Sequence, residues 1–88
     1  MLKITIQPGA RQCRLLLEGR LAGPWVAELR RAWQAAAQSP AVFVDLHEVD
    51  FVDLDGQALL TEMHRAGVRL EASSPFVRHM VEEISGAA

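Results

Sequence analysis

The sequence predicts an α/β domain with a mixed four-stranded sheet and about three helices, in the order ββαβαβα. Two strand-like segments joined by a turn open the chain, and helical and strand-like periodicities then alternate. The 88 residues accommodate one domain, which we expect to span residues 1–88. Half of the residues are hydrophobic and 23% are charged, which is the balance of an ordinary globular protein.

The opening hairpin is predicted from alternation and from turn residues. Residues 2–7 alternate apolar and polar side chains, which is the period of a strand with one face in water. Pro8 and Gly9 form a turn, and residues 13–18 follow as a second strand that we expect to end at Gly19. The short connection between the two strands predicts an antiparallel pair.

Three helices are predicted from apolar residues at three- and four-residue spacing. The first begins at Pro24 and ends near Pro40, the second begins at residues 53–56 and ends at Gly67, and the third follows residues 73–75. We expect these helices to bury one stripe each against the sheet. The side chains expected in the core are Trp25, Leu29, Trp33, Leu59, Met63, Phe76, Met80 and Ile84.

The remaining segments supply two strands, a loop and a tail. Residues 41–46 form an almost continuous apolar run, which predicts a central strand. Residues 68–72 alternate again and predict a fourth strand. Between the central strand and the second helix, residues 47–50 are predicted as a polar loop. Residues 85–88 are predicted as a frayed tail.

Charge and composition exclude several classes of function. Nine Lys and Arg against eleven Asp and Glu give a net charge of −2, and the basic residues are dispersed, which argues against a nucleic-acid binder. The single cysteine, Cys13, excludes an internal disulfide and a cysteine-based metal site. No apolar stretch is long enough to span a membrane and no secretion signal opens the chain, so we expect a cytoplasmic protein.

The densest polar segment, residues 45–55, joins the central strand to the second helix. The carboxyl ends of strands form the usual functional edge of an α/β sheet. One hypothesis is a metal- or small-ligand-binding enzyme that uses Asp45, His47, Asp53 and Asp55 around an ion or a water molecule. Nothing elsewhere in the chain completes a catalytic constellation, so we expect no catalytic residue, no metal ligand and no cofactor.

Residues 42–56 resemble the signature of STAS domains, the sulfate-transporter and anti-sigma-factor-antagonist family. The matching residues are Asp45, Leu46, Val49, Phe51, Asp53 and Gly56. Residues 17–21 and 66–68 are similar to two further motifs of the family, and the resemblance covers roughly residues 2–85. Many family members add a further strand and helix at the C-terminus, so these elements are expected to be shortened or missing here.

The resemblance implies the family's fold and a non-catalytic protein-interaction module in bacterial signalling and regulation of transcription. The implied partner is of the anti-sigma factor or serine-kinase type. In regulated members the phosphoacceptor Ser or Thr directly follows the Asp of this motif, and this chain has Leu54 there, followed by Asp55. Leucine carries no hydroxyl, so we expect no phosphorylation at this position and a missing serine-kinase switch.

The start of the second helix has features that follow from physical chemistry alone. Asp53 is placed to accept hydrogen bonds from free N–H groups, and Gly56 leaves room for the preceding loop or a partner to approach the backbone. For Asp55 we expect a plain helix-capping role.

We predict that a partner protein binds the segment 47–50 and the start of the second helix. The predicted partner-binding residues are His47, Glu48, Asp50, Asp53, Leu54, Asp55, Gly56 and Gln57. A third hypothesis is a structural subunit that works only as an oligomer, which leaves a homodimer open.

Overall fold

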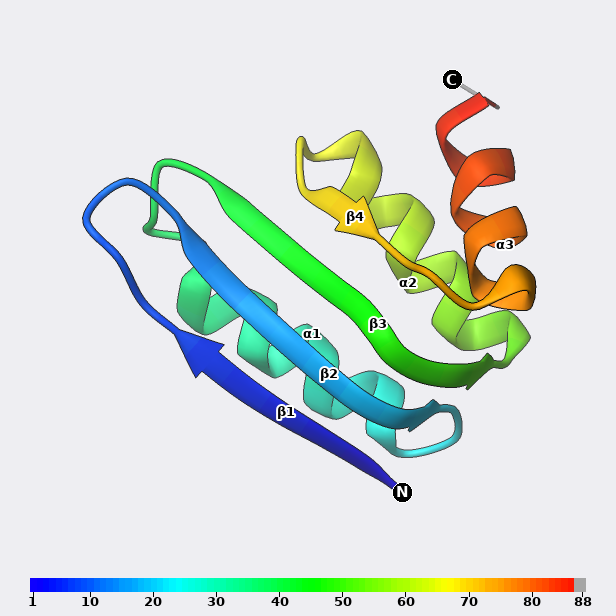
Figure 1. The fold of residues 1–88 in the computed structure, drawn as a ribbon. Helices are drawn as coiled ribbons and strands as arrows, with labels where there is room; N and C mark the ends of the chain where they lie inside the picture. The colour runs from blue at the N-terminus through cyan, green and yellow to red at the C-terminus, as the bar shows by residue number, and fades with distance from the viewer. Residues whose placement is uncertain (87–88) are drawn as a thin grey trace.

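The computed structural model describes residues 1–86 and confirms the predicted fold class. Over these residues one sheet has the strand order β1-β2-β3-β4, with β1 antiparallel to β2 and with β2, β3 and β4 parallel (Figure 1). The elements are β1 (Leu2–Gln7), β2 (Cys13–Leu21), α1 (Trp25–Ala36), β3 (Val42–Val52), α2 (Leu54–Arg65), β4 (Arg69–Glu71) and α3 (Pro75–Gly86).

The helices α1, α2 and α3 form one layer against the sheet (Figure 1). The two parallel crossovers step across the sheet in the same direction, and right-handed crossovers of this kind place their helices on the same face. Helix α2 lies between α1 and α3 and contacts both. The helix starts and the carboxyl ends of the parallel strands therefore meet at one edge of the sheet, at the lower right of Figure 1.

The core lies between this helical layer and the sheet. In β2 the residues Cys13, Leu15 and Leu17 are buried, and the residues between them are half-buried on the open face. Of the predicted core side chains, the two tryptophans are half-buried and pack against the core. The buried ones are Leu29, Leu59, Met63, Met80 and Ile84.

The prediction that Phe76 lies in the core is wrong, since 47% of its surface is exposed. The buried stripe of α3 runs through Val77, Met80 and Ile84. Phe76 lies at the edge of that stripe, about 100° around the helix from Val77 and about 40° from Met80, so its ring lies at the boundary between core and solvent. Its ring instead contacts Phe51 edge to face, with 6.1 Å between the ring centroids.

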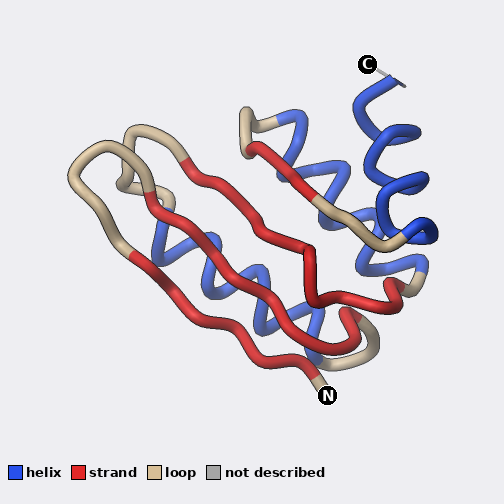
Figure 2. The backbone as a smooth tube through the Cα atoms, viewed as in Figure 1, coloured by secondary structure: helices blue, strands red, loops and turns tan. Residues whose placement is uncertain are grey.

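The predicted loop 47–50 is also wrong, because these residues continue β3 as far as Val52. Opposite β2, β3 holds one extra residue at each of two places, so it carries bulges that bend the strand, as Figure 2 shows. Bulges break the alternation of buried and exposed residues, which is why this part of the sequence has no strand pattern. The pairs flanking the bulges are Leu16 with Asp45, Glu18 with Glu48, Gly19 with Val49, and Arg20 with Phe51.

Two predicted ends also differ. Strand β2 does not end at Gly19 but continues to Leu21. Gly19 has a φ of 112°, and a Cβ there would clash with the carbonyl oxygen of Met1, so only glycine lets the strand pass this point. The predicted tail is wrong for residues 85–86, which belong to α3, and residues 87–88 lie outside the described part. Within residues 1–86 no helix is long and apolar enough to cross a membrane.

Candidate functional site

The start of α2 is held by the side chain of Asp53. Its Oδ1 accepts the backbone N–H of Gly56 at 2.7 Å, which confirms the predicted capping role. Its Oδ2 accepts the backbone N–H of Gly23 at 2.9 Å. These bonds lower the pKa of the Asp53 carboxyl, and the bond from Gly23 has the largest effect. The side chain is therefore held as a carboxylate.

The turn between β2 and α1 therefore belongs to the same site, and sequence analysis missed it. Besides the Gly23 bond, the backbone N–H of Asp53 donates to the carbonyl oxygen of Leu21 at 3.1 Å. A Cβ on Gly56 would lie 2.8 Å from that same oxygen and 2.8 Å from Cγ1 of Val52. Gly56 is buried, and its missing side chain lets the end of β2 approach the helix backbone.

The first turn of α2 presents an apolar side chain to solvent. Leu54 is 83% exposed and Asp55, beside it, is exposed too, whereas Gln57 is half-buried. The expectation that Asp55 caps the helix is wrong, because the capping side chain is that of Asp53. Asp55 lies within the first helical turn, where a negative charge interacts favourably with the helix dipole.

A groove of about 450 Å³ adjoins Leu54. It lies between the end of β3, the start of α2 and the first turns of α3. The apolar side chains along it are those of Phe51, Val52, Leu54, Phe76 and Met80. Sequence analysis did not predict the contribution of α3, because apolar residues at helical spacing were all assigned to the core.

The predicted partner-binding residues do not all lie at this groove. Asp50 is exposed at the second bulge of β3, close in the chain to Asp53, whereas His47 and Glu48 are exposed further upstream. At about 3.3 Å per residue, up to about 20 Å of strand separates His47 from Asp53. The structure thus divides the predicted set into a part at the helix start and a part along β3.

The side chain of Asp45 bonds to neighbouring residues of the sheet, on the face that the helices leave open. Its Oδ2 pairs with the Arg14 guanidinium, which also lies 4.9 Å from the centroid of the Phe43 ring. Its Oδ1 accepts the backbone N–H of His47 at 3.0 Å and lies 2.5 Å from Nδ1 of the same residue. Burial raises the pKa of this carboxyl, but the bonds from Arg14 and His47 outweigh burial and bring it to about 2.

The structure does not assemble the hypothetical enzyme site. Asp45 and His47 bond to each other on β3. Both carboxylate oxygens of Asp53 accept backbone N–H groups, and Asp55 lies on the surface of α2. Across residues 1–86, no three His, Cys, Asp or Glu side chains gather where they could hold a metal ion.

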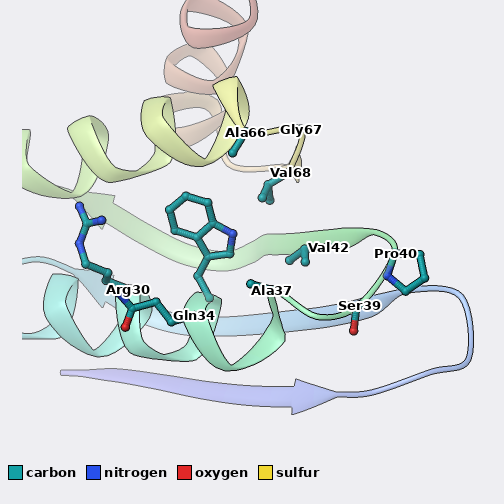
Figure 3. Close-up of a pocket in the computed structure, with 10 residues that line it drawn as sticks. Arg30, Gln34, Ala37, Ser39, Pro40, Val42, Ala66, Gly67 and Val68 are labelled. Carbon is teal, nitrogen blue, oxygen red and sulfur yellow. The ribbon is translucent and has the colours of Figure 1, made fainter.

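A second cavity, of about 430 Å³, lies at the other end of the helical layer (Figure 3). Arg30 and Gln34 of α1 line one side, and Ala66 and Val68 line the other. Arg30 bonds to Glu62 of α2, with 2.6 Å between nitrogen and oxygen. None of the residues that we predicted to bind a partner lines this cavity.

Comparison with known proteins shows likeness in structure only. No protein-family model matches the sequence, and no curated protein matches it. Among solved structures, the anti-sigma factor antagonist SpoIIAA in its unphosphorylated form matches with a TM-score of 0.69 and 15% identity, over 92% of this chain and 83% of that chain. An uncharacterized DUF3478-family protein with a SpoIIAA-like fold, from Shewanella loihica PV-4, matches with a TM-score of 0.62 and 11% identity, over 99% of this chain and 79% of that chain.

A larger protein contains a similar unit. The structure of Mglu matches 81% of this chain with a TM-score of 0.63 and 22% identity. This chain spans 19% of the length of that Mglu chain. At these identities the likeness establishes the fold alone, and the chain has the SpoIIAA-like, STAS-like α/β fold that the motif at residues 42–56 predicted.

Proposed function

We propose that the chain is a non-catalytic protein-interaction module of a bacterial, cytoplasmic regulatory pathway, and that it binds an anti-sigma factor or a related serine-kinase-type regulator. The observation that carries the proposal is the 83% exposure of Leu54 at the start of α2. Exposed apolar side chains that adjoin an apolar groove are typical of surfaces that bind another protein. The SpoIIAA-like fold supports the class of partner.

The hydrogen bonds at the helix start support the same function. Asp53 accepts bonds from Gly56 and Gly23, and these bonds restrain the turn that precedes Leu54. A surface that is ordered before it binds loses less conformational entropy on association. Leu54 and the adjoining groove supply apolar contact, and Asp55, exposed beside Leu54, supplies a charge.

Binding through this surface is not released by serine phosphorylation of the helix start. Position 54 has no hydroxyl, and Thr61 is the only Ser or Thr between residues 47 and 61. Thr61 lies almost two turns inside α2, where its hydroxyl donates to the carbonyl oxygen of Gln57 at 2.9 Å. The start of α2 thus has no serine-kinase switch of the kind found in regulated STAS members.

Calorimetric titration of anti-sigma factors from the same genome, with the wild-type protein and with Leu54→Arg, tests this function. Leu54→Arg weakens binding by about 1–3 kcal/mol, because apolar contact is lost and a charge is desolvated in the interface. Ile6→Arg is the matched control, since Ile6 is 45% exposed on β1, away from the helix start. A folded Leu54→Arg protein that binds its partner at full strength contradicts the proposal.

A further inference from the structure

The groove beside Leu54 follows one stripe of α3. The residues Phe76, His79, Met80 and Glu83 line it at positions i, i+3, i+4 and i+7. This spacing places them on one side of the helix over about 10 Å, or two turns. Met80 is buried and forms the floor, whereas Phe76 is 47% exposed and forms a wall with Phe51. The groove is therefore an elongated trough parallel to a helix.

The rim of this trough is acidic. Asp53 and Glu83 line it, and the described part of the chain contributes no Lys or Arg to the lining. Asp55 and Asp50 are exposed in the same stretch of chain. Glu83 pairs with His79, at 2.6 Å between Oε1 and Nε2. The nearby guanidinium of Arg20 lies over the Phe51 ring, 4.6 Å from its centroid. Within residues 1–86, the lining thus holds two carboxylates, of Asp53 and Glu83, and no Lys or Arg around an apolar floor.

We infer that this trough receives an amphipathic helix of the partner that carries apolar anchors on one side and Lys or Arg along its flanks. Helices pack well along a two-turn stripe, and a groove of this form takes anchors at i, i+3 or i+4, and i+7. The acidic rim selects for basic flanks by charge complementarity. This inference rests on the proposed function, because it names the part of the partner that binds.

A synthetic peptide tests the inference without the natural partner. The probe is a helix-forming peptide of about 18 residues with leucines at i, i+3 and i+7 and lysines on both flanks. Its titration into ¹⁵N-labelled protein is expected to shift the amide signals of Leu54, Phe76 and Glu83. An analogue with glutamates in place of the lysines is expected to bind at least about ten-fold more weakly. Equal binding of both peptides, or shifts confined to the open face of the sheet, overturns the inference.

Apolar contact is tested by Phe76→Ser, with Ile6→Ser as its control, because the two side chains are similarly exposed at 47% and 45%. Phe76→Ser is expected to weaken the lysine peptide about ten-fold, and Ile6→Ser to leave its affinity unchanged. An equal effect of both substitutions overturns the inference.

Charge is tested by Glu83→Lys against Glu28→Lys. Both glutamates are exposed and pair within their own helix, Glu83 with His79 and Glu28 with Arg31, and both substitutions change the net charge equally. Glu83→Lys is expected to weaken the lysine peptide about five-fold and Glu28→Lys less than two-fold. Equal weakening means that only net charge attracts the peptide, which overturns the inference. Since Glu83 is exposed, this test is independent of any folding defect in Phe76→Ser.

The same variants separate this inference from the proposed function. If Leu54→Arg weakens binding of the anti-sigma factor as expected while Phe76→Ser and Glu83→Lys do not affect it, the inference about the trough is overturned and the proposed function stands. If no anti-sigma factor binds but the lysine peptide shows the expected variant effects, the trough stands and the proposed class of partner is wrong.

Discussion

The Asp53 carboxylate accepts the backbone N–H of Gly23 at 2.9 Å, across a separation of 30 residues in the chain. Its other oxygen accepts the N–H of Gly56, so one side chain joins the turn before α1 to the first turn of α2. The two helix starts therefore form one unit at the edge where we propose that the partner binds.

Asp53→Ala removes both bonds and is expected to lower the free energy of unfolding by about 1–2 kcal/mol. Asp53→Asn, which has only one acceptor oxygen, is expected to fall between wild type and alanine. Urea unfolding followed by circular dichroism measures these differences. Asp55→Ala is the matched control, expected within about 0.5 kcal/mol of wild type because this exposed side chain is not the cap. Equal losses for Asp53→Ala and Asp55→Ala would contradict the capping geometry.

Gly56→Ala is expected to destabilise the fold by about 1–3 kcal/mol. The added methyl group meets the carbonyl oxygen of Leu21 and Cγ1 of Val52, each at 2.8 Å, and the carbonyl belongs to the backbone, which cannot rotate away. Gly86→Ala, also in a helix but with open space around the new Cβ, is expected to leave stability unchanged or slightly raised. Thermal unfolding of the two variants gives the comparison, and a stable Gly56→Ala protein would show that β2 and α2 are not closely packed.

The Asp45 carboxyl predicts a dependence of stability on pH. Its pKa is lowered from 3.8 to about 2 in the folded protein, so the ionised form stabilises the fold above about pH 4. This contribution is expected to disappear as the pH falls from 3.8 towards 2. At pH 7, Asp45→Asn is expected to cost about 1.5–3 kcal/mol, because the bonds to Arg14 and His47 lose their charged acceptor.

The measurement is urea unfolding of wild type and Asp45→Asn between about pH 2 and pH 7. The difference between the two proteins is expected to be constant above about pH 5 and to shrink below about pH 4. Asp50→Asn, an exposed change of the same charge, is expected within about 0.5 kcal/mol of wild type at pH 7. If the difference in unfolding free energy between wild type and Asp45→Asn does not vary with pH, the charge of Asp45 does not contribute to stability, and the prediction is wrong.

Leu54→Ser is expected to restore a phosphoacceptor at the start of α2. Incubation with ATP and a serine kinase of the type implied by the STAS resemblance is expected to leave the wild-type protein unmodified between residues 47 and 61. The variant is expected to gain one phosphate, because the helix N-terminus and the Asp53 cap remain in place and favour an anion. Mass spectrometry of proteolytic fragments locates the phosphate. Phosphate within that segment of the wild-type protein would overturn the expectation.

The order of the elements and the character of the helix start were predictable from the sequence. Periodicity reports which side of an element is buried, so the helices, the hairpin and the strand that begins near residue 42 all follow from it. Capping is equally local, since Asp53 and Gly56 are only three residues apart, and the motif around them predicted the STAS-like fold.

Only the tertiary structure decided what residues 47–52, Asp45 and Phe76 do. Bulges depend on the register against a partner strand, so the second half of β3 has no pattern of its own that identifies it as a strand. Three features join residues that lie more than 20 positions apart in the chain. They are the Gly23–Asp53 bond, the pairing of Asp45 with Arg14, and the trough between α2 and α3. Local pattern determined each element of this protein, and packing between elements determined its surfaces, because a contact between distant residues exists only once the chain has brought them together.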